Sequence, residues 1–239
     1  MFPHLAHYNP DYRIRISKRA RRILIKVLPH GVVEVVLPEG VSEDRAKQVL
    51  HDRSEWLARA LQKVTQQAEL NPQTHSLRPD RIHLQAVEQE WSVDYQTRQQ
   101  KVKVDVTRQK IILPGNDSDT RTAQRLRQWL QRYAKEVLPE WLARVRDETG
   151  HRLNKISVRG QKTRWGSYSS AGNVNLNRNL LFVPADTVRY LFIHELSHSV
   201  HMNHSTAFWS EVEKHQCDYL QHEKILNEAA RTLPAWVYA

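Results

Sequence analysis

The sequence predicts an α+β fold, because segments with strand-like alternation are followed twice by segments with helical periodicity. Apolar and polar residues alternate in short stretches within residues 13–37 and 81–113, which is typical of strands with one buried face. Apolar residues then recur at helical spacing in residues 42–66 and 119–149. A chain of 239 residues is long enough for one large domain or two small ones with a real core.

The first group of elements ends with a capped helix. Strands within residues 13–37 are expected to turn at Pro29-His30-Gly31. Ser42 is the expected N-cap of a helix that runs to about Gln66. Residues 67–80 are polar and contain two prolines, which predicts a loop or linker.

The second group repeats this order. The expected strands are 81–87, 90–96, 101–106 and 109–113. The helix 119–149 follows, as a core helix packed under a later helix, and Pro139 is expected to kink or divide it. Hairpin, strand, Leu-Pro, Gly and helix thus occur twice, and Trp-Leu-Ala-Arg occurs at 56–59 and 141–144. This indicates either an internal repeat or two strand–helix units that are alike by chance.

Residues 188–200 predict a helix that carries an H-E-x-x-H pattern. His194 and His198 are four residues apart, so their imidazoles project from one helix face and can bind one metal ion. Glu195 is next to the first histidine and can take the proton of a metal-bound water. The pattern predicts a catalytic Zn²⁺ site with Glu195 as general base.

His204 is the expected third ligand, which requires the helix to end before it. Asn203 is expected in the left-handed conformation in a turn over residues 202–205, and Ser205 or Thr206 is expected to cap the next helix. Three protein ligands and one open position are the arrangement of a catalytic zinc.

Other third ligands stay open. His201 lies two helical turns after His194 and shares its face if the helix continues. Glu211 and Glu213 lie on the next expected helix and are further candidates. The sequence gives no reason to assign His215 and His222 a role beyond that of surface histidines.

A second motif, Arg164-Trp165-Gly166-Ser167, lies between expected strands at 156–158 and 173–176. Trp165 and Gly166 indicate either core packing with a turn glycine or an edge strand that aligns an extended substrate. Arg164 is the candidate for contact with a carbonyl, a phosphate or a developing oxyanion. Asn177 is expected to orient the metal helix or a ligand histidine.

Together these motifs resemble the YgjP-like (DUF45) metal-dependent hydrolases, which are relatives of the SprT and WLM zinc metallopeptidases. The resemblance covers about residues 155–215. The matching residues are Lys162, Arg164, Trp165, Gly166, Ser167, Asn177, His194, Glu195, His198, His204, Ser205, Phe208 and Trp209. Tyr168 stands where these proteins usually have a cysteine. The resemblance implies a zincin-like (gluzincin-like) core in the C-terminal half, with His194, His198 and His204 on zinc and Glu195 as base.

Three functions are compatible with these residues. The first is a zinc metallopeptidase that acts on a peptide or protein. The second is a nucleoside triphosphate pyrophosphatase, which needs basic groups near the metal, with Arg164, Lys162 and Arg159 as candidates. The third is a non-enzymatic zinc-containing nucleic-acid binder, which needs a fourth zinc ligand, and no Cys-x-x-Cys pair is present to provide it.

The charge distribution separates the two halves of the chain. The net charge is +10, and residues 13–26 are rich in Lys and Arg. They indicate a solvated basic strand face or weak electrostatic contact with nucleic acid, without the interleaved aromatics of a single-strand binding platform. Because the N-terminal half has no catalytic constellation of its own, we expect residues 1–117 to form a β-rich wall of the cleft or a substrate-recognition region, and residues 118–239 to form the catalytic region.

The expected location is cytoplasmic. No apolar run approaches the ~18–20 residues of a membrane span, and the N-terminus lacks the pattern of a signal peptide. Cys217 is the single cysteine, which excludes a disulfide within the chain, and it is expected to be a structural thiol in a helical segment. The oligomeric state does not follow from the sequence.

Overall fold

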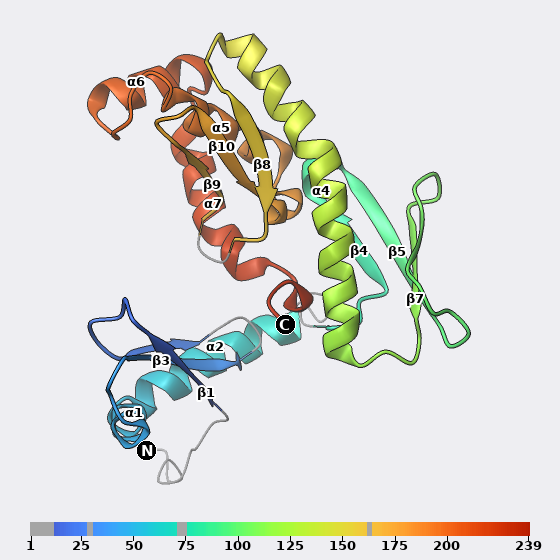
Figure 1. Ribbon diagram of the computed structural model, residues 1–239, viewed down its shortest axis with the longest axis vertical. Helices are drawn as coiled ribbons and strands as arrows, with labels where there is room; N and C mark the ends of the chain where they lie inside the picture. The colour runs from blue at the N-terminus through green and yellow to red at the C-terminus, as the bar shows by residue number, and fades with distance from the viewer. Residues whose placement is uncertain (1–11, 28–30, 71–75, 162–163) are drawn as a thin grey trace. The chain divides into compact units, whose positions relative to one another are not determined.

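The computed structural model describes residues 12–27, 31–70, 76–161 and 164–239 (Figure 1). The chain forms two compact units that divide between His75 and Ser76. The boundary expected at residues 117–118 does not coincide with this division. The roles predicted for its two sides, substrate recognition or a cleft wall and catalysis, stay predictions. Lys162, Pro29 and His30 lie outside the described residues.

The first unit is a small sheet covered by two helices. Its strands are β1 (Tyr12–Ser17), β2 (Leu24–Val27) and β3 (Val33–Pro38), in the order β1-β3-β2. The helices are α1 (Glu43–Asp52) and α2 (Ser54–Leu70), so the one expected helix is interrupted at Arg53. Apolar side chains of the sheet and the helices form the core: Val33, Val35, Leu37, Ala46, Leu50 and Leu57.

The basic face of β1 is partly neutralised within this unit. The Nε atoms of Arg13 and Arg15 lie 3.3 and 3.4 Å from the two carboxylate oxygens of Glu34 on β3. Both arginine side chains are about half exposed, whereas Glu34 is largely buried. The strand therefore uses part of its positive charge to pair a buried carboxylate.

The second unit contains two further sheets. The first has the order β4-β5-β7-β6 and consists of β4 (Arg81–Leu84), β5 (Gln89–Gln96), β6 (Lys103–Asp105) and β7 (Lys110–Pro114), with the short 3₁₀ helix η2 (Gln85–Val87) after β4. The second has the order β8-β10-β9 and consists of β8 (Lys155–Arg159), β9 (Gly166–Tyr168) and β10 (Asn173–Asn177). The 3₁₀ helix η3 (Arg178–Phe182) follows β10.

The helix α4 (Asp119–Thr149) is continuous and lies alongside both sheets of this unit (Figure 1). The Ser118 side chain accepts the Arg121 N–H at its start, and Gly150 ends it with a φ of 71°. Pro139 does not divide the helix, but the helix axis changes direction in its C-terminal part (Figure 1). A proline removes one hydrogen bond, and the flanking Leu138 and Leu142 are both fully buried, so packing keeps the helix continuous.

The same three-strand arrangement occurs three times along the chain. In β1-β2-β3, β5-β6-β7 and β8-β9-β10, the first and third strands are parallel and the second pairs antiparallel with the third. The sequence pattern suggested two such units, at the first two positions. The third unit precedes the helix with the H-E-x-x-H pattern.

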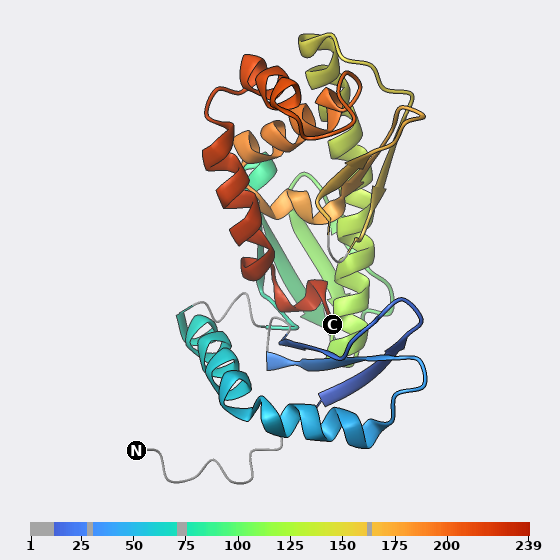
Figure 2. The same cartoon turned by 90° about the vertical axis from the view of Figure 1, so that its left-hand side faces the viewer.

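Three helices complete the second unit: α5 (Ala185–Ser197), α6 (Thr206–His215) and α7 (Tyr219–Thr232), followed by the 3₁₀ helix η4 (Ala235–Val237) (Figure 2). The Trp141 ring on α4 lies edge-on to Phe192 on α5, with ring centroids 5.3 Å apart. This contact confirms the expected packing of the long helix against the helix with the histidines. Within the described part of the chain, every helix is too short or too polar to cross a bilayer.

Candidate metal centre

Three histidine rings converge where α5 ends. His194 lies in the last turn of α5, His198 is its C-cap, and His204 precedes α6. The Nε2 atoms of His194 and His204 are 3.1 Å apart, and possible ligand atoms of all three lie within 4.8 Å of one another. Zinc–nitrogen bonds of about 2.0–2.1 Å in a tetrahedron place two nitrogens ~3.3 Å apart. The donor set of these three residues, the first cluster, therefore fits one shared zinc ion.

The chain reverses earlier than expected between the second and third histidines. The helix ends at Ser197, and tight turns follow in which the His201 N–H donates to the Ser197 carbonyl. Asn203 is not in the left-handed conformation; in the described part of the chain, the non-glycine residues with positive φ are Glu88 and Gln109. The expected cap is present, since the Ser205 hydroxyl accepts the Phe208 N–H at 3.5 Å.

A backbone contact orients His198. Its Nδ1 lies 3.0 Å from the His201 carbonyl oxygen. A carbonyl oxygen can only accept a hydrogen bond, so Nδ1 carries the ring hydrogen. This leaves Nε2 free as a metal ligand. His201 thus contributes its carbonyl to the site, and its ring is not part of the first cluster.

A buried phenylalanine supports all three rings. Phe208 on α6 is fully buried, and its ring centroid lies 5.0, 4.6 and 4.8 Å from those of His194, His198 and His204. Burial, together with the two neighbouring histidines, lowers the pKa of His194 to about 3. Its ring is therefore neutral near pH 7, which is the form that binds metals.

The Glu195 side chain is buried against strand β9. It is only 6 % exposed, and burial raises its pKa to about 7, opposed by the backbone N–H of Tyr168 and the charge of Arg164. Gly166 on the same strand is the point of closest approach. A Cβ atom there would lie 2.6 Å from the Glu195 Oε1, so only glycine lets the strand lie so close to this carboxylate.

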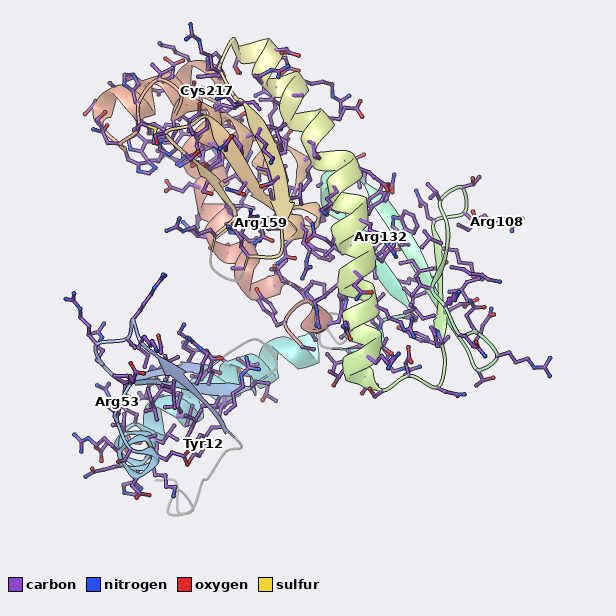
Figure 3. The ribbon with its side chains drawn as sticks, viewed as in Figure 1. Tyr12, Arg53, Arg108, Arg132, Arg159 and Cys217 are labelled. Atoms are coloured by element: carbon purple, nitrogen blue, oxygen red, sulfur yellow. The ribbon has the colours of Figure 1, made fainter. Side chains whose placement is uncertain are left out.

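These residues line a cavity of about 310 Å³. Its lining includes the expected metal ligands and both expected catalytic residues: Arg164, Gly166, Ser167, Tyr168, His194, Glu195, His198, Met202 and His204. Arg159, at the end of β8 (Figure 3), does not line it. The sequence did not predict that Gly166 and the Tyr168 N–H approach Glu195 or that Phe208 packs against the three histidines, because these contacts join residues that are distant in the chain.

The side chains of Asn177 and Trp165 form hydrogen bonds with backbone groups. Asn177 donates from Nδ2 to the carbonyls of Gln161 and Arg164, both at 2.8 Å, and accepts the Asn179 N–H. The expectation that Asn177 orients a ligand histidine is therefore wrong. The Trp165 Nε1 donates to the Leu226 carbonyl on α7 at 3.0 Å, which favours the packing interpretation of this ring.

Several residues near the C-terminus differ from expectation. His222 is buried rather than at the surface, and its ring lies 3.0 Å from the Thr187 hydroxyl and 3.1 Å from Asp218. Cys217 is exposed in the turn between α6 and α7 (Figure 3) rather than inside a helix. Cys217 was misplaced because the turn after α6 has no glycine or proline to mark it. The burial of His222 depends on its contact with Thr187 on α5, which the local sequence does not show.

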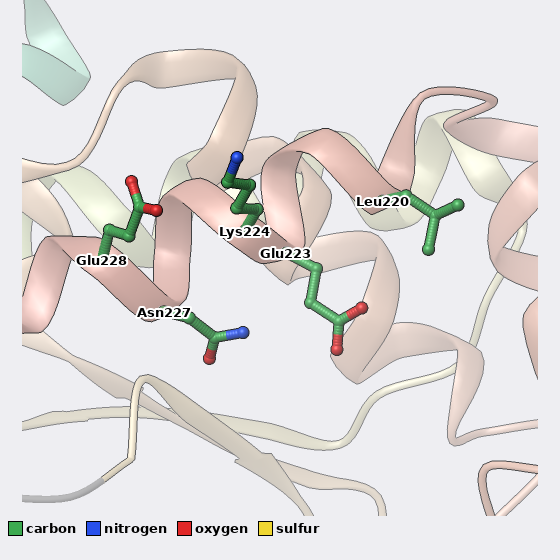
Figure 4. Close-up of a pocket in the computed structure, with 5 residues that line it drawn as sticks. All are labelled: Leu220, Glu223, Lys224, Asn227 and Glu228. Atoms are coloured by element: carbon green, nitrogen blue, oxygen red, sulfur yellow. The ribbon is translucent and has the colours of Figure 1, made fainter.

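A second hollow, of about 380 Å³, runs along α7 (Figure 4). It is lined by residues of this one helix: Leu220, Glu223, Lys224, Asn227 and Glu228. None of them belongs to the expected site, so this hollow does not extend the metal centre.

Comparison with known proteins gives a family match over most of the chain. A family model described as the YgjP-like metallopeptidase domain matches residues 21–229. Among solved structures, the chain is similar to the metallopeptidase zymogen abylysin of Pyrococcus abyssi, at 25 % identity, over 38 % of this chain and 90 % of that one, with a TM-score of 0.34. No curated protein matches the sequence significantly.

Proposed function

The chain belongs to the YgjP-like metallopeptidase family, and from this premise we propose that it is a zinc-dependent peptidase with Glu195 as general base. The family makes it a metal-dependent hydrolase. The proposal assigns the metal to His194, His198 and His204 in the first cluster.

Zinc is the ion that this donor set suits best. Three imidazole nitrogens around an open position are a frequent catalytic zinc arrangement. In the described part of the chain, no fourth His, Cys, Asp or Glu joins the first cluster, which argues against a closed structural site. A bound zinc ion supplies a Lewis acid that polarises the scissile carbonyl and makes a coordinated water more acidic.

Glu195 has the environment of a general base. Its raised pKa of about 7 lies near the operating pH of a neutral hydrolase, where a base can both accept and return a proton efficiently. The Tyr168 N–H holds the carboxylate in place. Arg164 lines the same cavity and is the donor that we assign to the oxyanion of the tetrahedral intermediate.

The edge of β9 is the observation that favours a peptide substrate. The Asn177 N–H bonds the Trp165 carbonyl and the Ser169 N–H bonds the Asn173 carbonyl, so alternate residues of this strand face β10. Gly166 and Tyr168 therefore direct their backbone groups away from β10, on the side where the Tyr168 N–H meets Glu195. An extended peptide can pair with the remaining groups and cross the cavity beside the histidines.

The nucleotide alternative has less support. Of its candidate basic residues, Arg164 lines the cavity, Arg159 does not, and Lys162 lies outside the described residues. A triphosphate needs several converging cations rather than one.

One experiment separates the two substrates. Wild type and Glu195→Gln are incubated with unfolded protein and with nucleoside triphosphates, with and without a chelator. New peptide termini that require both the metal and Glu195 would establish the peptidase. Release of phosphate or pyrophosphate with the same requirements, and no cleavage of protein, would replace it by the nucleotide hydrolase.

A further inference from the structure

A second cluster of metal-ligating side chains lies at the carboxyl end of α4. His151 follows Gly150, the residue that ends α4, and Glu211 and His215 lie one turn apart on α6. Possible ligand atoms of these three residues lie within 4.8 Å of one another. We call them the second cluster. None of them lines the cavity at the first cluster.

The distances in the second cluster match those of a coordination sphere. The Glu211 Oε1 lies 3.4 Å from the Nε2 of His151 and 3.4 Å from the Nε2 of His215. Zinc bonds of about 2.0–2.2 Å to nitrogen and oxygen in a tetrahedron separate two ligand atoms by ~3.3–3.5 Å. One carboxylate oxygen thus has the correct spacing to both rings.

His151 lacks the partners that a buried imidazole needs. Its side chain is 2 % exposed, and among the described residues neither ring nitrogen makes a hydrogen bond of good geometry, since the 3.4 Å contact of Nε2 with Glu211 is poorly aligned. Leaving such groups unpaired is costly. A cation at Nε2 would give this ring a partner.

Lys214 holds the second oxygen of the same carboxylate. Its Nζ lies 2.6 Å from the Glu211 Oε2 and leaves Oε1 directed toward the two rings. The lysine side chain is two-thirds exposed, so water screens its charge from the cluster. The contact orients the carboxylate in the way that an outer hydrogen bond orients a metal ligand.

We propose that His151, Glu211 and His215 bind a second zinc ion, which joins the end of α4 to α6. Two imidazoles and a carboxylate are a ligand set that zinc accepts. Because α6 also carries Phe208, which backs the first cluster, the second ion would fix the helix that supports the catalytic histidines. Arg189 on α5 makes a parallel link, since it donates to the His215 carbonyl and to Glu148.

Zinc stoichiometry tests the proposal directly. Purified full-length variants are dialysed against a zinc-buffered solution, and bound zinc is measured by elemental mass spectrometry. We expect two equivalents in wild type, one in His215→Ala, one in Glu211→Gln and one in His198→Ala, and none in His198→Ala/His215→Ala. His83→Ala removes an exposed histidine on β4, outside both clusters, and should keep two.

The outcomes distinguish this site from the first cluster. His215 is a quarter exposed, so its replacement is less disruptive than that of His151. Unchanged zinc binding in both His215→Ala and Glu211→Gln would overturn the second site. One equivalent in wild type that His215→Ala and Glu211→Gln remove and His198→Ala keeps would support the second site and reject zinc binding by the first cluster.

Thermal unfolding provides a readout that does not depend on activity. In the His198→Ala protein, zinc at about 100 times its dissociation constant should raise the unfolding temperature by roughly 5–10 °C. The same zinc should not stabilise His198→Ala/His215→Ala. Equal stabilisation of the two proteins, or of neither, would show that no zinc ion joins α4 to α6 through these residues.

Discussion

At the scale of single residues, the site depends on how Glu195 is confined. The carboxylate is buried between the histidines of α5 and the backbone of β9, with a glycine where any side chain would collide with it. A base held in this way loses little freedom when it reacts, and it is sensitive to small displacements. Two substitutions separate its chemistry from its position.

Glu195→Gln should keep the metal and lose turnover, because the amide cannot accept a proton but preserves the shape of the side chain. We expect kcat to fall by ~10²–10⁴-fold with unchanged zinc content. His198→Ala should lose turnover and the zinc ion of the first cluster, since it removes one of that cluster's ligands. Peptide cleavage monitored by chromatography, with elemental analysis of each protein, checks both results. Undiminished metal-dependent turnover in Glu195→Gln would reject the general-base assignment.

Gly166→Ala should impair catalysis while the metal stays bound. The new Cβ would meet the Glu195 Oε1 at 2.6 Å and displace the carboxylate, and a shift of this kind costs up to ~10²-fold in rate. Gly115→Ala is the control, because its Cβ would also lie too close to a neighbour, here the Thr97 backbone nitrogen at 3.0 Å, but away from the metal centre. It should lose about 1–3 kcal/mol of stability and keep wild-type kcat. Equal kcat in the two variants would contradict the role of Gly166.

At the scale of elements, the short strand β9 connects the sheet to the base. It is the edge strand of its sheet, its inner groups pair with β10, and its outer Tyr168 N–H contacts Glu195. The loop before β9 is held by Asn177, which bonds the Arg164 carbonyl. The strand β9 and the loop before it therefore position Glu195, Arg164 and the free strand edge together.

Tyr168→Pro removes the backbone N–H that Glu195 accepts, and an edge strand tolerates proline. We expect kcat to fall by roughly 10–100-fold with zinc retained. Tyr168→Phe keeps this N–H and loses only the phenol, which donates to the Arg152 carbonyl at 3.0 Å, so its kcat should stay near that of wild type. Steady-state kinetics on one peptide compares them, and the same loss in both would place the effect in the side chain instead.

At the scale of the whole molecule, all residues of both clusters lie in the unit that begins at Ser76. The three-strand arrangement is present in both units, but only its third copy leads into the helix with the histidines. The first unit has the sheet and helices without a histidine cluster in its described part. The role expected from the sequence for residues 1–117, as a wall of the cleft or in substrate recognition, stays a prediction that removal of the first unit tests.

A fragment of residues 76–239 should bind as much zinc per chain as the full protein. We expect its kcat on a short peptide to change by less than ~3-fold, and KM for a protein substrate to rise if residues 1–75 recognise it. Circular dichroism establishes folding first, and zinc content and kinetics follow. A folded fragment with unchanged KM for protein would contradict the recognition role, whereas a folded fragment without zinc would contradict the placement of the metal site.

The sequence by itself determined the features that depend on local spacing. The helix at 119–149, the strands around it, and the projection of His194 and His198 from one turn of helix follow from periods of 2 and 3.6 residues. The Ser205 cap is equally local, because a hydroxyl and an N–H three residues later are bound to meet once the helix starts. Spacing favoured His204 as the third ligand but left other candidates open, and the family resemblance implied His204.

Only the tertiary structure decided which distant groups meet. Glu211, a candidate third ligand by sequence, lies with His151 and His215 instead, and His222 is buried against α5. The approach of Gly166 and the Tyr168 N–H to Glu195 joins a sheet edge to a helix. Such contacts depend on how whole elements pack, and packing selects among many arrangements that share the same local pattern.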